Sequence, residues 1–310
     1  MFAASSLSMI GGGDMRQEKK VKKTFPLAIA CLPLIALTQT ALAQKLPPLL
    51  KQAESFTLRL DSYVEYGFHD DDVGDSSGTG FLIDKEKGWI LTNAHVSSYG
   101  TGDIEGAFID TGYEPLKYVY VDTDLDLAVL AIEPNLIPAT ATAAVLDCTD
   151  SDPEGRDVVV YGHPENLSFS ATRGIISKLR RSQFNDALQT DAAINPGNSG
   201  GAIIDIESGK VIGMSSSKIV DEKIEGIGFG VPARPICKVL DLLRNGKTPT
   251  PPKPLFRFAS DFQTEEYLFV GAPYGNAILP KGIEIGDKLT SVNGKEISSP
   301  TEYTTELRGI

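Results

Sequence analysis

Three short motifs constrain this chain more than any other feature of its sequence. The first contains His95, which closely follows an apolar run; the second contains Asp126, directly before Leu-Ala-Val-Leu; the third places Ser199 among glycines in Asn195–Gly201. A weak nucleophile, a base and an orienting carboxylate are the three parts of a serine-hydrolase triad. The motifs therefore indicate a site for nucleophilic catalysis built from these three residues.

The order of the three residues along the chain narrows the fold. Subtilisin-like enzymes place the aspartate first, whereas α/β-hydrolases place the serine first and the histidine last. The stretch Gly197–Gly201 formally contains the G-x-S-x-G pattern of α/β-hydrolases, but no histidine follows Ser199. Only the chymotrypsin-like order of histidine, aspartate and serine fits.

The glycines around Ser199 suit the same chemistry. Gly197 allows a sharp turn, so that its N–H and the N–H of Ser199 can point at one spot and bind the oxyanion of a tetrahedral intermediate. Gly200 and Gly201 leave room for a substrate backbone beside the nucleophile. We therefore expect an oxyanion hole at Gly197 and Ser199.

Longer stretches around these residues resemble one protease family. Gln189–Gly201 looks like the nucleophile loop of HtrA/Deg proteases, and Thr92–Val96, Asp126–Leu130 and Gly226–Pro232 resemble other segments of that family. The resemblance covers roughly residues 55–245 and continues more weakly to the end. It implies an all-β fold of two six-stranded antiparallel β-barrels, chymotrypsin-like, with a C-terminal helix and then an incomplete PDZ-like α+β segment.

The resemblance also implies a function. It points to a serine endopeptidase that cleaves unfolded or damaged proteins, needs no cofactor and assembles as a homo-trimer or larger oligomer. Two alternatives stay open. One is a catalytically silent peptide-binding or chaperone protein with a misaligned triad, and the other is a non-functional truncated product.

A substrate pocket can be predicted by the same comparison. In the family the floor of the pocket lies six positions before the nucleophile, which is uncharged Ala193 here, not the nearby Asp191. An uncharged floor cannot pair with Lys or Arg, so we expect cleavage after small or medium apolar residues such as Val or Ala. The alternative is that Ile194 and Phe229 simply fill the core. The predicted pocket residues are Ala193, Ile194, Ile227, Gly228 and Phe229.

Two further details follow from the motifs. Asn198 stands where digestive enzymes of this type carry an aspartate that pairs with a new N-terminus, so we expect no activation by such a salt bridge.

Asp122 and Asp124 are rivals of Asp126 for the role of the orienting carboxylate. They do not directly precede the apolar run, so we expect them to stabilise the turn instead.

Charge and the N-terminal segment bear on location. The net charge is −12, while the first 43 residues are net basic, so the remainder is strongly acidic. An acidic body argues against nucleic-acid partners and anionic membrane surfaces. A basic cluster, an apolar stretch and Ala41-Leu42-Ala43 predict a cleaved signal peptide and export to the periplasm. The alternative is an uncleaved membrane anchor, because Thr24–Gln44 is uncharged and just long enough to span.

Segment composition gives the expected organisation. The helical period is clear at Pro235–Arg244. Short β-rich runs between turns predict two sets of strands: first Phe56–Leu60, Gly80–Ile83, Trp89–Thr92, Tyr118–Val121 and Leu127–Ile132, and then Val158–Tyr161, Ser168–Ser177, Ala202–Ile206, Lys210–Met214 and Ile227–Val231. Asn293-Gly294 predicts a tight hairpin turn, and Ser299 with Glu302 a capping box. The expected parts are an upstream extension (1–14), a signal peptide (15–43), a lead-in (44–56), the protease domain (57–245), a Pro-rich linker (246–254) and a partial PDZ-like domain (255–310).

The remaining histidines and the cysteines carry weaker signals. His69 lies in an acidic loop whose spacing does not match a calcium site, and His163 reads as a loop residue, so no metal is expected. After cleavage Cys148 and Cys237 remain. Export permits a disulfide between them, but two widely spaced cysteines do not establish one.

Overall fold

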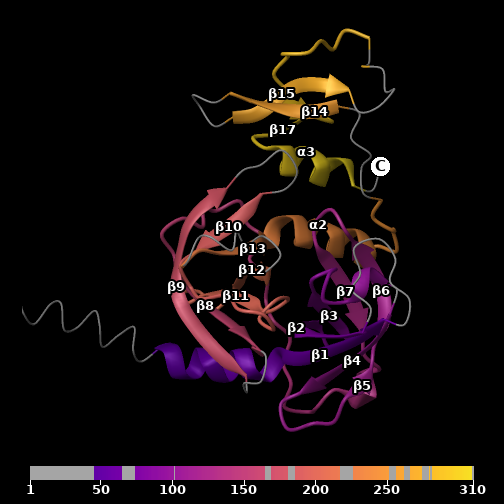
Figure 1. The fold of residues 1–310 in the computed structure, drawn as a ribbon, viewed down its shortest axis with the longest axis vertical. Coiled ribbons are helices and arrows are strands. Elements are labelled where there is room, and N and C mark those ends of the chain that lie inside the picture. Colours follow the sequence, from indigo (N-terminus) through magenta and orange to yellow (C-terminus); the bar gives the residue numbers. More distant parts are fainter. Residues whose placement is uncertain are drawn as a thin grey trace, which may run out of the picture. The chain divides into compact units, whose positions relative to one another are not determined.

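A computed structural model describes residues 45–64, 74–100, 102–164, 169–180, 186–216, 226–250, 256–261, 266–273, 279 and 281–308. The expected upstream extension and signal peptide, as well as His69, lie outside the described residues. Figure 1 shows the elements in chain order by colour.

The first half of the chain forms a seven-stranded antiparallel sheet in the order β5-β4-β1-β2-β3-β7-β6. Burial alternates along β1, where Leu58 and Leu60 face the core, as expected for a sheet with one buried face. The expected first barrel had six strands, whereas this sheet has seven. Its strands are β1 (Thr57–Val64), β2 (Gly74–Asp84), β3 (Trp89–Thr92), β4 (Asp103–Phe108), β5 (Glu114–Pro115), β6 (Lys117–Asp122) and β7 (Leu127–Ala131).

The second half forms a closed six-stranded barrel in the order β10-β13-β12-β11-β8-β9, drawn in pink to orange in Figure 1. Its strands are β8 (Asp157–Gly162), β9 (Ser170–Arg180), β10 (Ala187–Thr190), β11 (Ala202–Asp205), β12 (Val211–Ser216) and β13 (Gly228–Pro232). The predicted all-β, chymotrypsin-like fold class is confirmed. The barrel interior is filled by Val158, Val160, Ile176, Leu188, Ala192, Ile203 and Ile212.

A helix precedes the first sheet, where the sequence predicts only a lead-in. Residues 45–56 are helical, and Leu49, Ala53 and Phe56 are buried. These three positions are spaced as one face of a helix.

Helix α2 (Ala233–Arg244) follows the barrel and agrees with the predicted helix to within two residues. Ile236, Val239 and Leu240 are buried on one face. Cys237 of α2 forms a disulfide with Cys148, which lies just before the barrel. The bridge fastens the segment between the two sheets to this helix.

The C-terminal segment contains two small hairpins and a helix. They are β14 (Phe256–Asp261) with β15 (Glu266–Pro273), β16 (Ser291–Val292) with β17 (Lys295–Glu296), and α3 (Pro300–Leu307). Asn293 and Gly294 both have positive φ, 50° and 79°, which is the backbone of a type I′ turn, as predicted. The predicted start of α3 is also confirmed, because Ser299 Oγ accepts the N–H of Glu302.

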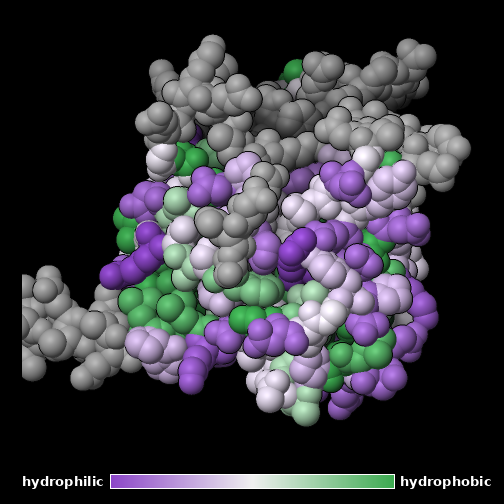
Figure 2. Space-filling view, turned by 60° about the horizontal axis from the view of Figure 1, so that its bottom comes forward, coloured by the Kyte–Doolittle hydropathy of each residue, from purple (hydrophilic) through white to green (hydrophobic). Residues whose placement is uncertain are grey.

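The surface is mixed in polarity. On the face in Figure 2, hydrophilic side chains surround separate hydrophobic patches. Within the described ranges, no helix is long and apolar enough to cross a membrane.

Candidate active site

His95 lies on a tight turn that follows β3. Its neighbours Ala94 and Val96 are buried, with 0% and 2% of their surface exposed, so the turn is anchored on both sides of the histidine. Asn93, also fully buried, donates its side-chain amide to the carbonyl of Asp126 at 3.1 Å. The backbone around His95 is therefore fixed against the turn that carries the aspartate.

Asp126 ends the turn between β6 and β7 and has a left-handed backbone, φ 51°. Its two carboxylate oxygens each lie 2.9 Å from His95 Nδ1, and one of them also accepts the backbone N–H of His95 at 3.1 Å. Since the carboxylate accepts a hydrogen bond at Nδ1, the neutral ring keeps its proton there and leaves the lone pair on Nε2. The pairing sets the tautomer that a general base requires.

Sequence reasoning missed a third partner of this carboxylate. Ser216, at the end of β12, donates its hydroxyl to Asp126 Oδ2 at 2.9 Å. Hydrogen bonds from several donors hold a carboxylate in one orientation. No local motif marks Ser216, because the contact joins residues 90 positions apart.

Ser199 sits on two consecutive tight turns. Asn198 donates its N–H to the carbonyl of Asn195 at 3.0 Å, and the second of the two intervening residues is Gly197 with φ 89°. Gly201 then donates to the carbonyl of Asn198 at 2.9 Å, and Gly200 has φ 82°. Positive φ at the third residue defines a type II turn and favours glycine there. The glycine spacing of the motif is thus a consequence of turn geometry.

Thr79 of β2 connects the first sheet to this loop. Its backbone N–H donates to the carbonyl of Ser199 at 2.8 Å, and its hydroxyl donates to the carbonyl of Gly197 at 2.7 Å. The same hydroxyl accepts the N–H of His163 at 2.9 Å. A Cβ on Gly200 would lie 2.0 Å from the Thr79 carbonyl oxygen, so the two backbones approach as closely as glycine allows.

His95, Gly197 and Ser199 line one cleft of about 1020 Å³. The structure therefore brings the predicted histidine and serine to a common space, with the aspartate behind the histidine. The rest of the cleft comes largely from the first sheet and includes Arg59, Asp61, Asp75, Asp103 and Glu105.

The five predicted pocket residues are not among the residues that line this cleft. Ile194 is partly buried against the barrel core, and a Cβ on Gly228 would lie 2.8 Å from its Cδ1. Asp191 accepts the N–H of Ile175 at 2.7 Å, a structural contact. The specificity pocket stays a prediction.

Other polar residues near the site have structural partners. His163 packs edge-on against Phe169, with ring centroids 5.2 Å apart, and burial followed by the nearby Arg59 charge lowers the pKa of its ring. Asp122 accepts the N–H of Leu125 at 2.9 Å, which is the turn role expected for it. Among the described residues, no group of three or more His, Cys, Asp or Glu side chains could hold a metal ion.

Comparisons with known proteins agree with this geometry. Residues 78–214 match the model of the trypsin-like peptidase domain. The serine protease Do-like HtrA of Bacillus subtilis is 34% identical over 76% of this chain and 58% of its own length. The chain belongs to the HtrA/Deg family of serine proteases.

Two further members of the HtrA/Deg family show how far the likeness extends. The periplasmic serine endoprotease DegP of Escherichia coli is 32% identical over 72% of this chain and 49% of its own length. A solved HtrA-type protease, AlgW with a tripeptide, superposes with a TM-score of 0.64 at 25% identity, covering 84% of this chain and 87% of that one. The chain spans about half the length of the curated relatives that it matches.

Proposed function

We propose that this HtrA/Deg family member is a serine endopeptidase that cleaves unfolded or damaged proteins. The observation that carries the proposal is the pairing of His95 Nδ1 with both carboxylate oxygens of Asp126, beside a cleft that His95 shares with Ser199. This arrangement leaves His95 Nε2 available to a serine hydroxyl in the cleft.

The reaction uses each residue in turn. Ser199 Oγ attacks the scissile carbonyl carbon while His95 Nε2 takes the hydroxyl proton. His95 then returns that proton to the leaving amine, and Asp126 stabilises the imidazolium formed between the two steps. The N–H groups of Gly197 and Ser199 bind the oxyanion, and one such donor contributes roughly 2.7–4 kcal/mol to lowering the barrier.

Turnover of unfolded casein tests the activity. We expect the native chain to degrade casein, and Ser199→Ala to remove the activity without lowering the melting temperature by more than a few degrees. Casein turnover that persists in Ser199→Ala would reject the assignment. Casein binding with no turnover by the native chain would favour the peptide-binding alternative.

Cleavage-site preference is a separate part of the proposal. An uncharged Ala193 floor favours Val or Ala at the residue before the scissile bond. Peptides with Val and Lys at that position compare the two directly, and Ala193→Asp serves as the matched variant, because it supplies a carboxylate for Lys. Faster cleavage after Lys by the native chain, or no shift toward Lys in the variant, would reject this pocket.

Location and assembly complete the proposal. The basic, apolar and Ala-Leu-Ala segments of residues 15–43 direct export to the periplasm, and the mature chain begins at Gln44. N-terminal sequencing of the protein recovered from the periplasmic fraction tests this point. Assembly as a homo-trimer is tested by light scattering of the purified chain.

A further inference from the structure

Thr79, on β2, is fully buried, and each of its polar groups has a hydrogen-bond partner. Its hydroxyl accepts the backbone N–H of His163, which follows β8, and donates to the carbonyl of Gly197. Because the His163 N–H can only donate, the hydroxyl proton must point at the Gly197 carbonyl. The fold therefore fixes the direction of this hydrogen bond.

The carbonyls of the serine loop, residues 195–201, are held one after another. Thr79 binds the carbonyl of Gly197 through its hydroxyl and the carbonyl of Ser199 through its backbone N–H. Between these two, the carbonyl of Asn198 accepts the hydroxyl of Ser215, which belongs to β12. Three consecutive carbonyls are thus bonded, two of them to the first sheet and one to the barrel.

The N–H groups of the serine loop differ in what they donate to. Asn198 and Gly201 donate to carbonyls within the loop, and Gly200 donates to the carbonyl of Ser215. The N–H of Gly197 donates to no acceptor in the described part of the chain, although Gly197 lines the cleft. An N–H group that is unpaired at the cleft is suited to receive an oxyanion.

The placement of the Gly197 N–H decides how well it can serve. A donor lowers the barrier when it already lies about 2.7–3.1 Å from the position that the oxyanion will occupy, and a misplacement of about 1 Å can cost about 10²-fold in rate. Glycine has no Cβ to restrict its backbone, so Gly197 depends on outside contacts to keep its φ of 89°. The hydroxyl of Thr79 supplies such a contact.

We propose that Thr79 is a positioning residue for the oxyanion hole. Its hydroxyl holds the carbonyl of Gly197, so that the N–H of Gly197 stays directed into the cleft. Thr79 does not line the cleft and acts on the substrate only through Gly197. The role rests on the proposed function, because an oxyanion forms only if Ser199 attacks a carbonyl carbon.

Three substitutions of Thr79 separate the hydroxyl from the shape of the side chain. Thr79→Ser keeps the donor, Thr79→Val keeps the shape without the donor, and Thr79→Ala leaves room for a water to bridge to Gly197. We expect kcat on a peptide substrate to fall about ten- to hundredfold in Thr79→Val, less in Thr79→Ala, and less than about threefold in Thr79→Ser. KM should change little, because the donor acts on the transition state.

Thr57→Val is the matched control for the loss of a buried hydroxyl. Thr57 is fully buried on β1, and its Oγ1 donates to the carbonyl of Ala53 at 2.7 Å, the same distance as from Thr79 Oγ1 to the carbonyl of Gly197. Thr57 does not line the cleft. We expect Thr57→Val to lower the melting temperature, as Thr79→Val does, and to retain most of the native kcat. An equal loss of kcat in both variants would overturn the proposal, because general destabilisation would then explain it.

Two further measurements test whether the effect arises at the oxyanion hole or at His95. A peptide boronate forms a tetrahedral adduct with Ser199, in which one oxygen lies where the oxyanion forms. Its inhibition constant in Thr79→Val should therefore rise by about the same factor as kcat falls. The acid limb of the pH profile of kcat/KM, which reports His95 in the free enzyme, should keep its midpoint. A shifted acid limb with unchanged boronate inhibition would overturn the proposal.

The result for the native chain separates the positioning role from the protease assignment. If the native chain turns the peptide over and Thr79→Val keeps kcat within about threefold, the positioning role is wrong while the protease assignment stands. If kcat follows side-chain volume, with Thr79→Val above Thr79→Ser, the hydroxyl is not the determinant and the role is also wrong. Absence of turnover by the native chain would reject the protease assignment, and the positioning role with it.

Discussion

Arg308 donates through Nε to Asp122 Oδ2 at 3.0 Å, although the two residues are 186 positions apart. Their side chains are 1% and 0% exposed. Arg308 directly follows α3, and Asp122 is the last residue of β6, four positions before Asp126. The contact joins the C-terminal helix to the turn that presents the proposed catalytic carboxylate.

Loss of this arginine should be costly. Arg308→Met leaves the Asp122 carboxylate buried without its counter-charge, and breaking a buried pair costs about 3–5 kcal/mol. We expect this loss in urea unfolding followed by the fluorescence of Trp89, the single tryptophan. Adding Asp122→Asn should restore much of the stability, because the stranded charge is removed. A loss below about 1 kcal/mol in the single variant would show that the pair is not desolvated.

Ser216 should matter for turnover more than for binding. Ser216→Ala removes a donor to the Asp126 carboxylate, and a hydrogen bond to a charged group contributes about 1.5–3 kcal/mol. We expect kcat on a peptide substrate to fall at least roughly tenfold with little change in KM. Ser177→Ala, which changes an exposed serine of β9 that does not line the cleft, is the control and should retain most activity. Equal effects of the two variants would argue against a positioning role for Ser216.

A comparison of two glycines with similar backbone conformations distinguishes the cost of backbone strain from the cost of a steric clash. Gly200 and Gly155 have φ of 82° and 77°, but only at Gly200 would a Cβ meet a neighbour, the Thr79 carbonyl oxygen. Gly155→Ala should cost about 1–2 kcal/mol of stability and leave casein turnover intact. Gly200→Ala should cost more and abolish turnover, because the serine loop must move away from β2. Full activity in Gly200→Ala would mean that the close approach is not needed.

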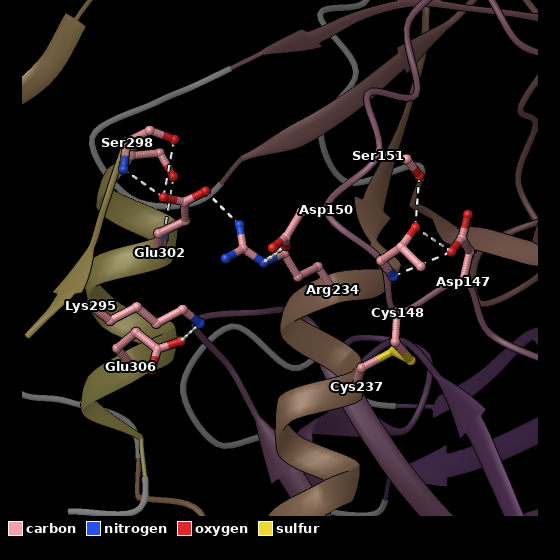
Figure 3. Close-up of polar contacts among 12 residues, drawn as sticks. Asp147, Cys148, Asp150, Ser151, Arg234, Cys237, Lys295, Ser298, Glu302 and Glu306 are labelled. Carbon is pink, nitrogen blue, oxygen red and sulfur yellow. Dashed lines mark hydrogen bonds and ion pairs between the residues drawn. A yellow bond between two sulfur atoms is a disulfide. The ribbon is translucent and has the colours of Figure 1, made fainter.

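The pH dependence of stability should reflect Glu302. Burial raises the pKa of its carboxyl group, but the hydrogen bond from the Ser298 N–H and the Arg234 guanidinium (Figure 3) outweigh burial and hold the pKa below its ordinary value of 4.5. A carboxyl with a lowered folded-state pKa contributes stability above its unfolded pKa and loses it as the pH falls through the folded value. We expect the melting temperature to drop below about pH 4.5 and Glu302→Gln to reduce this drop. An equal drop in native chain and variant would contradict the shift.

Local patterns were sufficient to predict the strands with strong periodicity, α2, the Asn293-Gly294 turn and the start of α3. They failed at β4, where Asp103, Glu105 and Gly106 interrupt the apolar pattern, and at β10, which is only four residues long. The helix at residues 45–56 was missed because Pro47 and Pro48 were read as a lead-in. The spacing of Leu49, Ala53 and Phe56 was the signal that could have found it.

The residues of the candidate site also fall into those that local motifs predict and those that only the fold brings together. His95, Asp126 and Ser199 could be predicted because each sits in a motif whose local turn geometry requires its neighbours. Ser216, Thr79 and Arg308 could not, since their roles arise from contacts between segments far apart in the chain. The Cys148–Cys237 disulfide was left open for the same reason, because only the fold brings the two residues together.

Covalent labelling with a fluorophosphonate, followed by peptide mapping, addresses the central claim most directly. If Ser199 is made nucleophilic by a histidine that Asp126 orients, the reagent should attach to Ser199 in the folded native chain and react far more slowly in His95→Ala. Attachment to a different serine, or equally fast reaction at Ser199 without His95, would contradict the account.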